Sequence, residues 1–271
     1  RHFRDPGFQG SMKMGLAGRI GLGLAVISMV LALGSLSGTA GVQQGRKHRH
    51  GMPNKHHHAA ASALNGYTEP GALIWGCRTL TRGAVLTFDD GPAGNQTLEL
   101  LDNLNTLGVK ATFFVVGGNA AAYPDIVRRI AAEGHEIGVH TWHHANMTQL
   151  QVSGLTDQMQ REVIDTEELI YNLTGRRPVL FRPPYGAVND GVRAFLASRG
   201  YTIVFWSGGC IDWWLHNPQQ ESQIIVNGMA DAGGLVCMHD SSPETCRGIA
   251  TLVNMLTATE PRQTMNPQGR R

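Results

Sequence analysis

The sequence predicts an α/β fold in which parallel strands form a barrel and helices cover its outside. From Gly71 onward, short apolar runs alternate with longer amphipathic segments, which is typical of a parallel sheet with helices packed against it. The number of such units within one domain favours a barrel. Polar residues directly follow several of the apolar runs, as expected where strands end at an active-site rim.

The expected elements alternate between strand and helix along this domain. Strands are expected over residues 84–88, 111–116, 136–140, 180–182, 203–206 and 235–238. Helices are expected over residues 98–107, 124–133, 156–173, 192–199 and 219–232. Chemistry in such barrels lies at the C-terminal ends of the strands, so the polar clusters that follow the apolar runs should meet on one rim. These clusters are Asp89 with Asp90, the segment from His140, the segment from Arg182, Asp212, and His239 with Asp240.

The segments outside the domain differ from it in composition. Residues 1–11 show no pattern and are assigned to upstream or cloning-derived sequence. Residues 12–42 contain a basic start and an uncharged stretch over residues 20–42, expected to be either a cleaved signal peptide or a signal anchor in the membrane. Residues 43–70 are expected to form a flexible His-rich linker, residues 71–257 the catalytic domain, and residues 258–271 a disordered tail.

Either form of the N-terminal segment would export the domain, so the expected location is secreted or at the cell surface. An oxidising compartment allows thiols to pair, and a bridge between Cys77 and Cys246 is favoured because it would close nearly the whole domain. Cys210 and Cys237 lie in apolar stretches and suit small buried core residues equally well. No C-x-x-C spacing occurs, so the sequence does not predict a zinc–thiolate site.

The charge of the chain argues against a nucleic-acid partner, and its sequons allow glycosylation. The chain has 23 Lys and Arg against 21 Asp and Glu, and no basic stripe interleaved with aromatic residues, so nucleic acid is not an expected partner. N-x-S/T sequons occur at Asn95, Asn146 and Asn172. Asn95 and Asn172 are the expected acceptors in a host that glycosylates, because Asn146 lies close to a candidate metal ligand.

Two clusters suggest a metal centre. Asp89 and Asp90 end a strand and precede Gly and Pro, and neighbouring residues on a strand point in opposite directions, so the two acids can serve different roles. His140 and His144 are spaced to share one face if the chain turns into a helix after the strand. Two His and one carboxylate form a common catalytic metal set that leaves positions open for water and substrate. His143 is interpreted as a bystander.

The remaining clusters suit a hydrolytic site that faces a sugar. Arg182 precedes two prolines that hold the backbone rigid, and an Arg beside a carboxylate keeps that group ionised and oriented. Asp212 is followed by Trp213 and Trp214, of which one is expected in the core and the other on a sugar-facing platform. His239 ends an apolar strand, where a proton donor to a leaving amine could lie.

Read in order, the motifs TFDDGP, HTWHH, RPPYG, DWW and CMHD resemble those of the polysaccharide deacetylase family, carbohydrate esterase family four, whose catalytic module is the NodB-homology domain. The resemblance extends over roughly residues 71–256. Each motif is short, but their order and separations make the match specific. The resemblance implies a distorted (β/α) barrel and metal-dependent N- or O-deacetylation of carbohydrate polymers.

The resemblance also implies roles for individual residues. Asp90, His140 and His144 would hold the metal, zinc or else cobalt, nickel or manganese, since such a set accepts several metals. Asp89 would be the general base and His239 the general acid.

Four further residues take supporting roles under the same resemblance. Arg182 would position the base and Asp212 would tune the acid. Trp213 would line the groove, and the backbone N–H of Tyr185 would stabilise the oxyanion. Two positions depart from the pattern of many relatives: Gly209 replaces an Asp, and Cys237 replaces a Leu. These departures concern the groove and the acetyl pocket rather than the ligands.

The expected substrate is therefore a polymer of N-acetylglucosamine, with chitin or chitooligosaccharides ahead of peptidoglycan. Deacetylation of acetylated xylan is an alternative that would use the same residues on an ester. A glycosidase is disfavoured because two adjacent acids cannot readily flank a glycosidic bond at the required separation of about 5 Å or more. A carbohydrate-binding module without activity is the alternative from another class.

Overall fold

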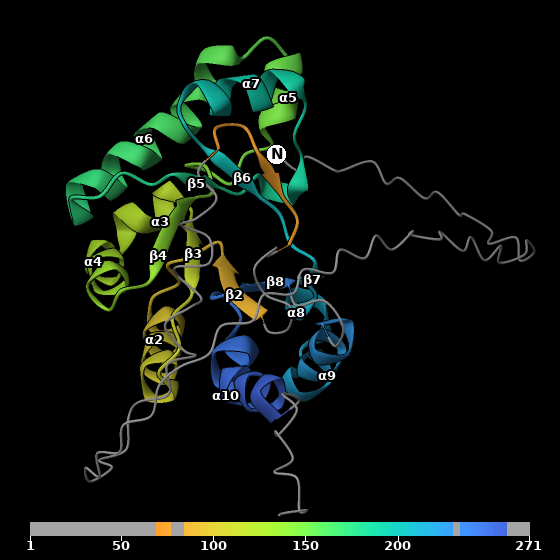
Figure 1. The fold of residues 1–271 in the computed structure, drawn as a ribbon. Coiled ribbons are helices and arrows are strands. Elements are labelled where there is room, and N and C mark those ends of the chain that lie inside the picture. The colour runs from red at the N-terminus through yellow and green to blue at the C-terminus, as the bar shows by residue number, and fades with distance from the viewer. Residues whose placement is uncertain (1–68, 77–83, 230–233, 259–271) are drawn as a thin grey trace, which may run out of the picture. The chain divides into compact units, whose positions relative to one another are not determined.

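An eight-stranded parallel sheet forms the centre of the protein, seen here as a computed structural model (Figure 1). The structure describes residues 69–76, 84–229 and 234–258. The strands are β1 (Leu73–Ile74), β2 (Ala84–Asp89), β3 (Thr112–Val115), β4 (Glu136–Val139), β5 (Leu180–Phe181), β6 (Thr202–Val204), β7 (Gly208–Gly209) and β8 (Gly234–His239). They pair in the order β1-β6-β5-β4-β3-β2-β8-β7, with each neighbouring pair parallel.

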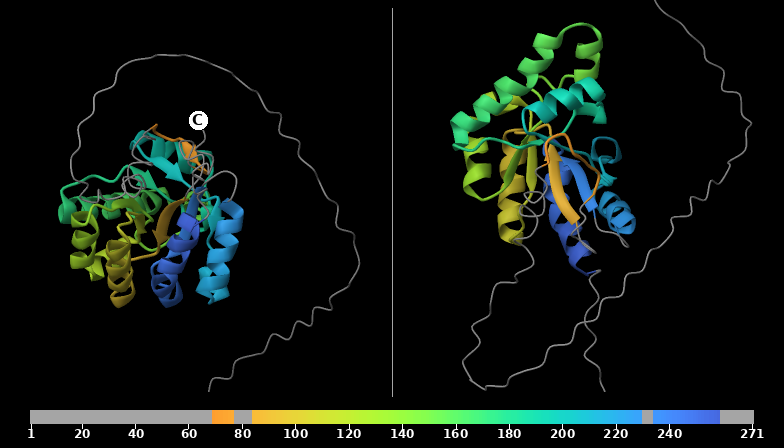
Figure 2. Two further views of the ribbon diagram at one scale, coloured as in Figure 1. Left: turned by 60° about the horizontal axis from the view of Figure 1, so that its bottom comes forward. Right: turned by 45° about the horizontal axis from the view of Figure 1, so that its top comes forward.

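The helices lie around the outside of the curled sheet (Figure 2). They are α2 (Asn95–Leu107), α3 (Gly117–Ala122), α4 (Pro124–Ala132), α5 (Met147–Val152), α6 (Thr156–Thr174), α7 (Asp190–Ser198), α8 (Asp212–Leu215), α9 (Pro218–Met229) and α10 (Pro243–Ala258), with the short 3-10 helix η1 at Pro184–Gly186. The predicted alternation of strands and helices is confirmed. The prediction missed α10, which packs against α2 and α9 and buries Ile249, Leu252 and Val253 at helical spacing.

The sheet is a distorted barrel rather than a closed one. Strands β6 and β7 are separated in the chain by only Phe205–Ser207, yet β7 is the last strand of the sheet order and β6 is next to the first. A chain segment of this length spans at most about 14 Å, so the two edges of the sheet face each other. The predicted distorted barrel is confirmed in this form.

Alternating side chains along the strands fill two separate cores. Leu86 of β2 and Phe113 of β3 face the helices, while their neighbours Val85 and Phe114 face the inside of the curled sheet. The inner cluster consists of Ile74, Val85, Phe114, Leu180, Val204 and Leu235. This apolar layer lies beneath the rim and leaves the C-terminal strand ends free to carry polar side chains.

Several predictions concern residues outside the described part of the chain. These are the upstream sequence, the export segment, the linker up to residue 68, the tail from residue 259, and Cys77. Among the described residues, no helix is both long and apolar enough to cross a membrane. Cys246 is buried in α10, and its thiol donates to the backbone oxygen of Asp240 at 3.4 Å. Its bridge with Cys77 stays a prediction.

His135, just before β4, makes the stability of the fold sensitive to pH. Its ring is buried edge-on against Phe113, and Nδ1 accepts a hydrogen bond from the backbone N–H of Ala111 at 3.1 Å. Burial and the nearby Lys110 lower the pKa of His135 to about 4. The folded protein therefore holds the neutral ring at pH values where the unfolded chain, with a pKa near 6.5, already binds a proton.

We expect this contribution to be present in full above about pH 6.5 and to be lost as the pH falls from there toward 4. Its upper limit is about 3 kcal/mol. Urea unfolding between pH 7.5 and 4.5 should show a shallower loss of stability in His135→Asn than in the unsubstituted protein. His143→Asn, at an exposed side chain, is the matched control. Equal pH slopes for His135→Asn and the unsubstituted protein would contradict the assignment.

Candidate metal and catalytic site

The polar clusters predicted at the strand ends meet in one pocket with a volume of about 500 Å³. It is lined by Asp89, Asp90, His140, His144, Pro183, Tyr185, Trp206, Cys210, Trp213, His239 and Ser241. These residues follow β2, β4, β5, β6, β7 and β8, or end those strands. The C-terminal rim therefore gathers the candidate residues, as the strand pattern predicted.

Asp90, His140 and His144 converge on one point of this pocket. Their ligand atoms lie within 4.8 Å of one another. Nε2 of His140 is 3.4 Å from Oδ1 of Asp90, and Nε2 of His144 is 3.3 Å from the same oxygen. Nδ1 of His140 is 2.7 Å from the backbone oxygen of Arg182, so Nδ1 carries the proton and Nε2 presents its lone pair to the cluster.

The two histidines reach this point from a loop, and the conditional expectation of a helix after the strand is wrong. Residues 140–146 are irregular, and Thr141 and His144 have φ angles of 64° and 56°. The loop is held by the buried Glu162 of α6, whose carboxylate accepts hydrogen bonds from the backbone N–H groups of Trp142 and His143 at 2.9 and 2.8 Å. These bonds replace the backbone ladder that a helical turn would supply.

The cluster suits a divalent cation. Oδ1 of Asp90 is buried and has no hydrogen-bond partner among the described residues, although a buried carboxylate oxygen is normally satisfied. Burial raises the pKa of Asp90, but its contacts with His140, His144 and His239 outweigh this and lower it. Burial and the neighbouring His140 lower the pKa of His144. Both groups are thus held in the deprotonated form that binds metal.

Asp89 is held by the most buried cation of the site. Arg182 is fully buried, and its Nη1 donates to Oδ1 of Asp89 and to Oγ1 of Thr87, both at 2.7 Å. Its remaining donors reach the backbone oxygens of Val204 at 3.2 Å and Phe205 at 2.8 Å. Because the guanidinium is fixed on all sides, the Asp89 carboxylate has a defined position beside the cluster of Asp90, His140 and His144.

His239 is oriented by Asp212. Oδ1 of Asp212 lies 2.7 Å from Nδ1 of His239, and Oδ2 accepts from the backbone N–H of His239 at 2.7 Å and from Oγ1 of Thr245 at 2.9 Å. Burial lowers the pKa of His239, but hydrogen bonds with Asp212 and Cys210 outweigh this and raise it to about 11. The ring is therefore protonated at neutral pH, with Nε2 directed into the pocket, 4.0 Å from Oδ2 of Asp90.

Aromatic side chains border the open side of the pocket. Tyr185 lies in η1 with a φ of 61°, and its ring packs edge-on against His144 with centroids 4.7 Å apart. Trp213 in the single-turn helix α8 lines the pocket, and its indole N–H donates to the backbone oxygen of Cys210 at 3.0 Å. Trp213 and Trp214 are 66% and 68% exposed, so the expectation that one lies in the core is wrong. Asp212 takes the inward position of this helix, and the next two side chains therefore point outward.

Four residues of the pocket lining were not predicted as site residues from the sequence: Pro183, Trp206, Cys210 and Ser241. Trp206 lies just beyond the end of β6, and Cys210 just beyond the end of β7. For Trp206 the strand-end rule was a usable signal, because the predicted strand 203–206 ends at this residue. For Cys210 the signal was hidden, since β7 is only two residues long and consists of glycines. The hydrogen bond with Cys237 lowers the pKa of the Cys210 thiol to about 6.

Two glycines are required by close approaches in the site. A Cβ at Gly91 would collide with the carboxylate of Asp240, which is also bound by Oγ1 of Thr97 at 2.7 Å. A Cβ at Gly209 would collide with the backbone oxygen of Cys237, and Gly209 has a φ of +81°. The departure at Gly209 from the motif of many relatives is therefore enforced by how closely β7 approaches β8 here.

Comparison with known proteins points to the family whose motifs the sequence resembles. The profile of the family "Polysaccharide deacetylase" matches residues 78–204. The chain is 36% identical over 172 residues to the peptidoglycan-N-acetylglucosamine deacetylase PgdA of Listeria monocytogenes, covering 64% of this chain and 35% of that protein. It is also 36% identical over 181 residues to a chitin deacetylase of Pestalotiopsis sp, covering 65% and 58% of the two chains.

A solved structure supports the fold. The peptidoglycan deacetylase PdaC of Bacillus subtilis superposes with a TM-score of 0.59 at 31% identity, over 66% of this chain and 85% of that chain. The chain thus spans about a third of the length of the Listeria protein but most of the solved Bacillus domain. The superposition with the Bacillus protein covers 66% of this chain.

Metal binding by the three converging residues can be tested directly. We expect Asp90→Ala, His140→Ala and His144→Ala each to lower metal affinity by more than about tenfold, because each removes a ligand rather than a supporting group. Metal analysis after dialysis against a zinc buffer measures this. His143→Ala is the matched control, since its ring points to Glu162 and should leave the metal content unchanged. Equal loss of metal in the control would contradict the assigned ligand set.

Proposed function

Because the chain belongs to the polysaccharide deacetylase family, we propose that it removes acetyl groups from a polymer of N-acetylglucosamine, with chitin or chitooligosaccharides as its preferred substrate. The observation that carries the proposal is that a carboxylate, Asp89, and a protonated imidazole, His239, flank the Asp90, His140 and His144 cluster in one pocket. Amide hydrolysis needs these three elements together: an activated water, a stabilised oxyanion and a protonated leaving group.

Asp90, His140 and His144 would hold a divalent cation, zinc or else cobalt, nickel or manganese, whose chemistry there is to polarise the acetyl carbonyl and to acidify water. The protein's own part begins with Asp89. Its carboxylate takes the proton of the attacking water while the hydrogen bond from Arg182 holds it in position. The backbone N–H of Tyr185 donates to the oxyanion that forms on the acetyl oxygen.

His239 completes the reaction. Its Nε2–H donates the proton to the amine nitrogen as the carbon–nitrogen bond breaks, so that acetate and a free amine leave. Asp212 holds the ring through Nδ1 and stabilises its protonated form. Asp212 is therefore a positioning residue, since its carboxylate is buried behind His239 and bonded to Thr245.

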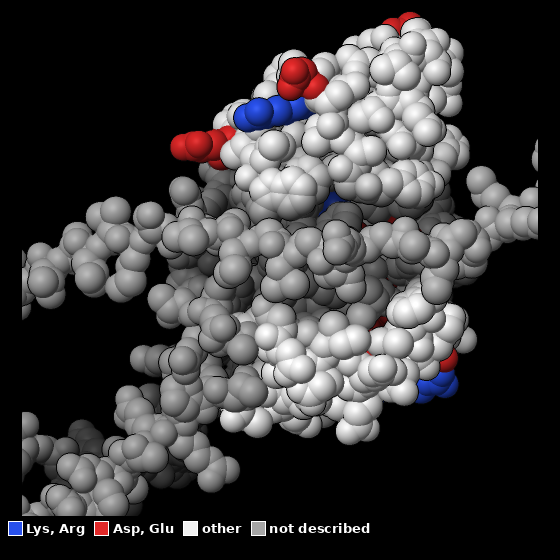
Figure 3. All heavy atoms as spheres, turned by 90° about the vertical axis from the view of Figure 1, so that its right-hand side faces the viewer, with Lys and Arg blue, Asp and Glu red and all other residues white. Residues whose placement is uncertain are grey.

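The rim of the pocket suits a neutral polysaccharide. Trp213 and Tyr185 expose aromatic rings beside the site, and apolar ring faces stack on pyranose faces. On the face shown in Figure 3, the described surface carries few charged side chains, which offers little to a polyanion such as nucleic acid. We also propose that the uncharged stretch over residues 20–42 exports the domain to an extracellular polymer, as a signal peptide or as a membrane anchor.

The preference for chitin rests on the cysteines and the sequons of the chain rather than on the geometry of the pocket. The chain is 36% identical to a chitin deacetylase, whereas it is 36% identical to one peptidoglycan deacetylase and 42% identical over 129 residues to another, from Bacillus cereus. The pattern of Cys77 and Cys246 and the sequons favour a eukaryotic secretory route, and hence chitin over peptidoglycan.

Acetate release from chitin oligomers, peptidoglycan fragments and acetylated xylan, measured side by side, tests the substrate. We expect chitin oligomers to give the highest kcat/KM and a chelator to abolish release on all of them. Faster acetate release from xylan would show that the enzyme prefers an ester bond to an amide bond. The appearance of new reducing ends would indicate a glycosidase. Binding without acetate release would leave only a carbohydrate-binding module.

The role of Asp89 can be separated from metal binding. We expect Asp89→Asn to lower kcat for acetate release by about 10²–10⁴-fold, the usual range for a lost proton transfer, while metal content stays at the level of the unsubstituted protein. Asp125→Asn, at an exposed residue of α4, is the matched control and should keep full activity. Full acetate release by Asp89→Asn would overturn the mechanism.

A further inference from the structure

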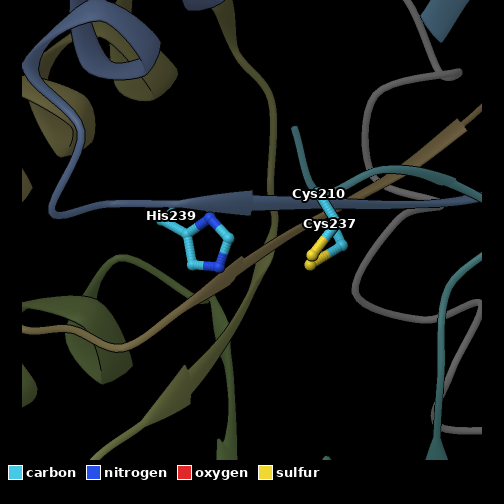
Figure 4. Close-up of side chains that lie close together, drawn as sticks. All are labelled: Cys210, Cys237 and His239. Carbon is cyan, nitrogen blue, oxygen red and sulfur yellow. The ribbon is translucent and has the colours of Figure 1, made fainter. Parts of the chain in front are cut away.

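We propose that Cys210, Cys237 and His239 form a second metal site, one for a soft divalent cation such as Cd²⁺ or excess Zn²⁺, and that its occupation blocks the proton donor of the active site. The three side chains lie close together at the ends of β7 and β8 (Figure 4). They share no residue with the cluster of Asp90, His140 and His144. The inhibitory part rests on the proposed role of His239, whereas the binding part does not.

The pairing of β7 with β8 brings the two thiols together. Gly209 is the register partner of Cys237, and the next residue, Cys210, donates its backbone N–H to the oxygen of Cys237 at 2.5 Å. Cys210 has a φ of 62°, a left-handed backbone conformation that residues other than glycine rarely adopt. The ligand atoms of the two Cys and the His lie within 4.8 Å of one another. In a tetrahedral zinc site they are roughly 3.4–3.8 Å apart, so only small side-chain shifts are needed.

His239 already has the hydrogen bonding of a metal-bound imidazole. Its Nδ1 is bonded to the buried carboxylate of Asp212 at 2.7 Å, which leaves Nε2 as the nitrogen available to an ion. A histidine that binds a metal almost always donates its other ring N–H to a carboxylate, a carbonyl or water. The same Asp212 contact that prepares His239 for proton transfer therefore also prepares it as a ligand.

The donor set selects a soft ion. Two thiolates and an imidazole favour zinc and softer metals, while the neighbouring set of two imidazoles and a carboxylate is a harder one. The Cys237 thiol donates to Oδ2 of Asp89 at 3.5 Å and would give up this bond on binding an ion as a thiolate. Two thiolates and a dication sum to zero charge, so the bound ion adds no net negative charge beside that carboxylate. The ion would enter through the pocket, because Cys210 and His239 line it and Cys237 is buried behind them. Binding releases the two thiol protons and the Nε2 proton of His239 to solvent.

Occupation of this site has a direct consequence for the proposed reaction. An ion on Nε2 of His239 takes the lone pair that must carry the proton to the leaving amine. A soft metal in excess over the catalytic one should therefore inhibit acetate release while the Asp90, His140 and His144 cluster remains filled.

A cadmium titration of the full chain, reduced and already loaded with its catalytic metal, tests the proposal. We expect one equivalent of Cd²⁺ to produce thiolate-to-metal charge-transfer absorption and to inhibit acetate release. Cys210→Ser and Cys237→Ala should each lose the absorption, and each should need more than about tenfold more Cd²⁺ to inhibit, compared with its own activity before Cd²⁺. Cys246→Ala is the matched control, since its thiol is bonded to Asp240 instead, and it should keep both effects.

Several results would overturn the site: no charge-transfer absorption, absorption that survives in both Cys210→Ser and Cys237→Ala, or absorption lost in Cys246→Ala. A Cys210–Cys237 disulfide found by mass spectrometry in the reduced protein would also overturn it. Thermal unfolding of each variant shows that a loss of absorption is not a loss of fold. Absorption with undiminished acetate release would overturn the inhibitory part, and absorption in a protein that releases no acetate would refute the proposed function alone.

Discussion

The parallel ladder between β2 and β8 is the constraint on which the site depends. Its register runs from Ala84 opposite Gly234 to Asp89 opposite His239, so the proposed base and the proposed acid are direct partners across two neighbouring strands. The ladder also carries Cys237 opposite Thr87, which binds Arg182. A shift by one residue would turn each of these side chains to the other face of the sheet. The apolar run in both strands fixes the register, since Val85 and Leu235 fill the barrel interior together.

Arg182 shows how the fold supports a charge at the end of an apolar barrel. Its guanidinium lies 4.2 Å over the ring of Phe114, which belongs to the inner core, and all its polar contacts are with Asp89, Thr87 and backbone oxygens. Removal of one partner from a buried ion pair typically costs about 3–5 kcal/mol, because the other charge is left uncompensated. Asp89 and Arg182 therefore depend on each other for folding as well as for the proposed reaction.

The strands and the rim could be predicted from the sequence because local signals carry them. The apolar runs that became β2, β4, β5 and β8 end in or are followed by polar residues, and barrels place their chemistry there. The sequence contains fewer local signals for the conformation of the loops that connect these strands. The loop of His140 to His144 has two residues with positive φ, held by Glu162 from a distant helix. No spacing rule could report that contact, and a helix was the wrong expectation.

The thiols illustrate the same limit in another way. Cys210 and Cys237 are 27 positions apart, so no short cysteine motif could indicate their proximity, and the sequence did not predict a zinc–thiolate site. They meet because β7 pairs with β8 across a glycine whose Cβ would strike the opposite backbone. The two departures from the motifs of many relatives, Gly209 and Cys237, are thus register partners rather than independent changes. Gly209 allows the close approach that places Cys210 beside Cys237. Cys210 lines the pocket next to His239, and Cys237 is buried behind it.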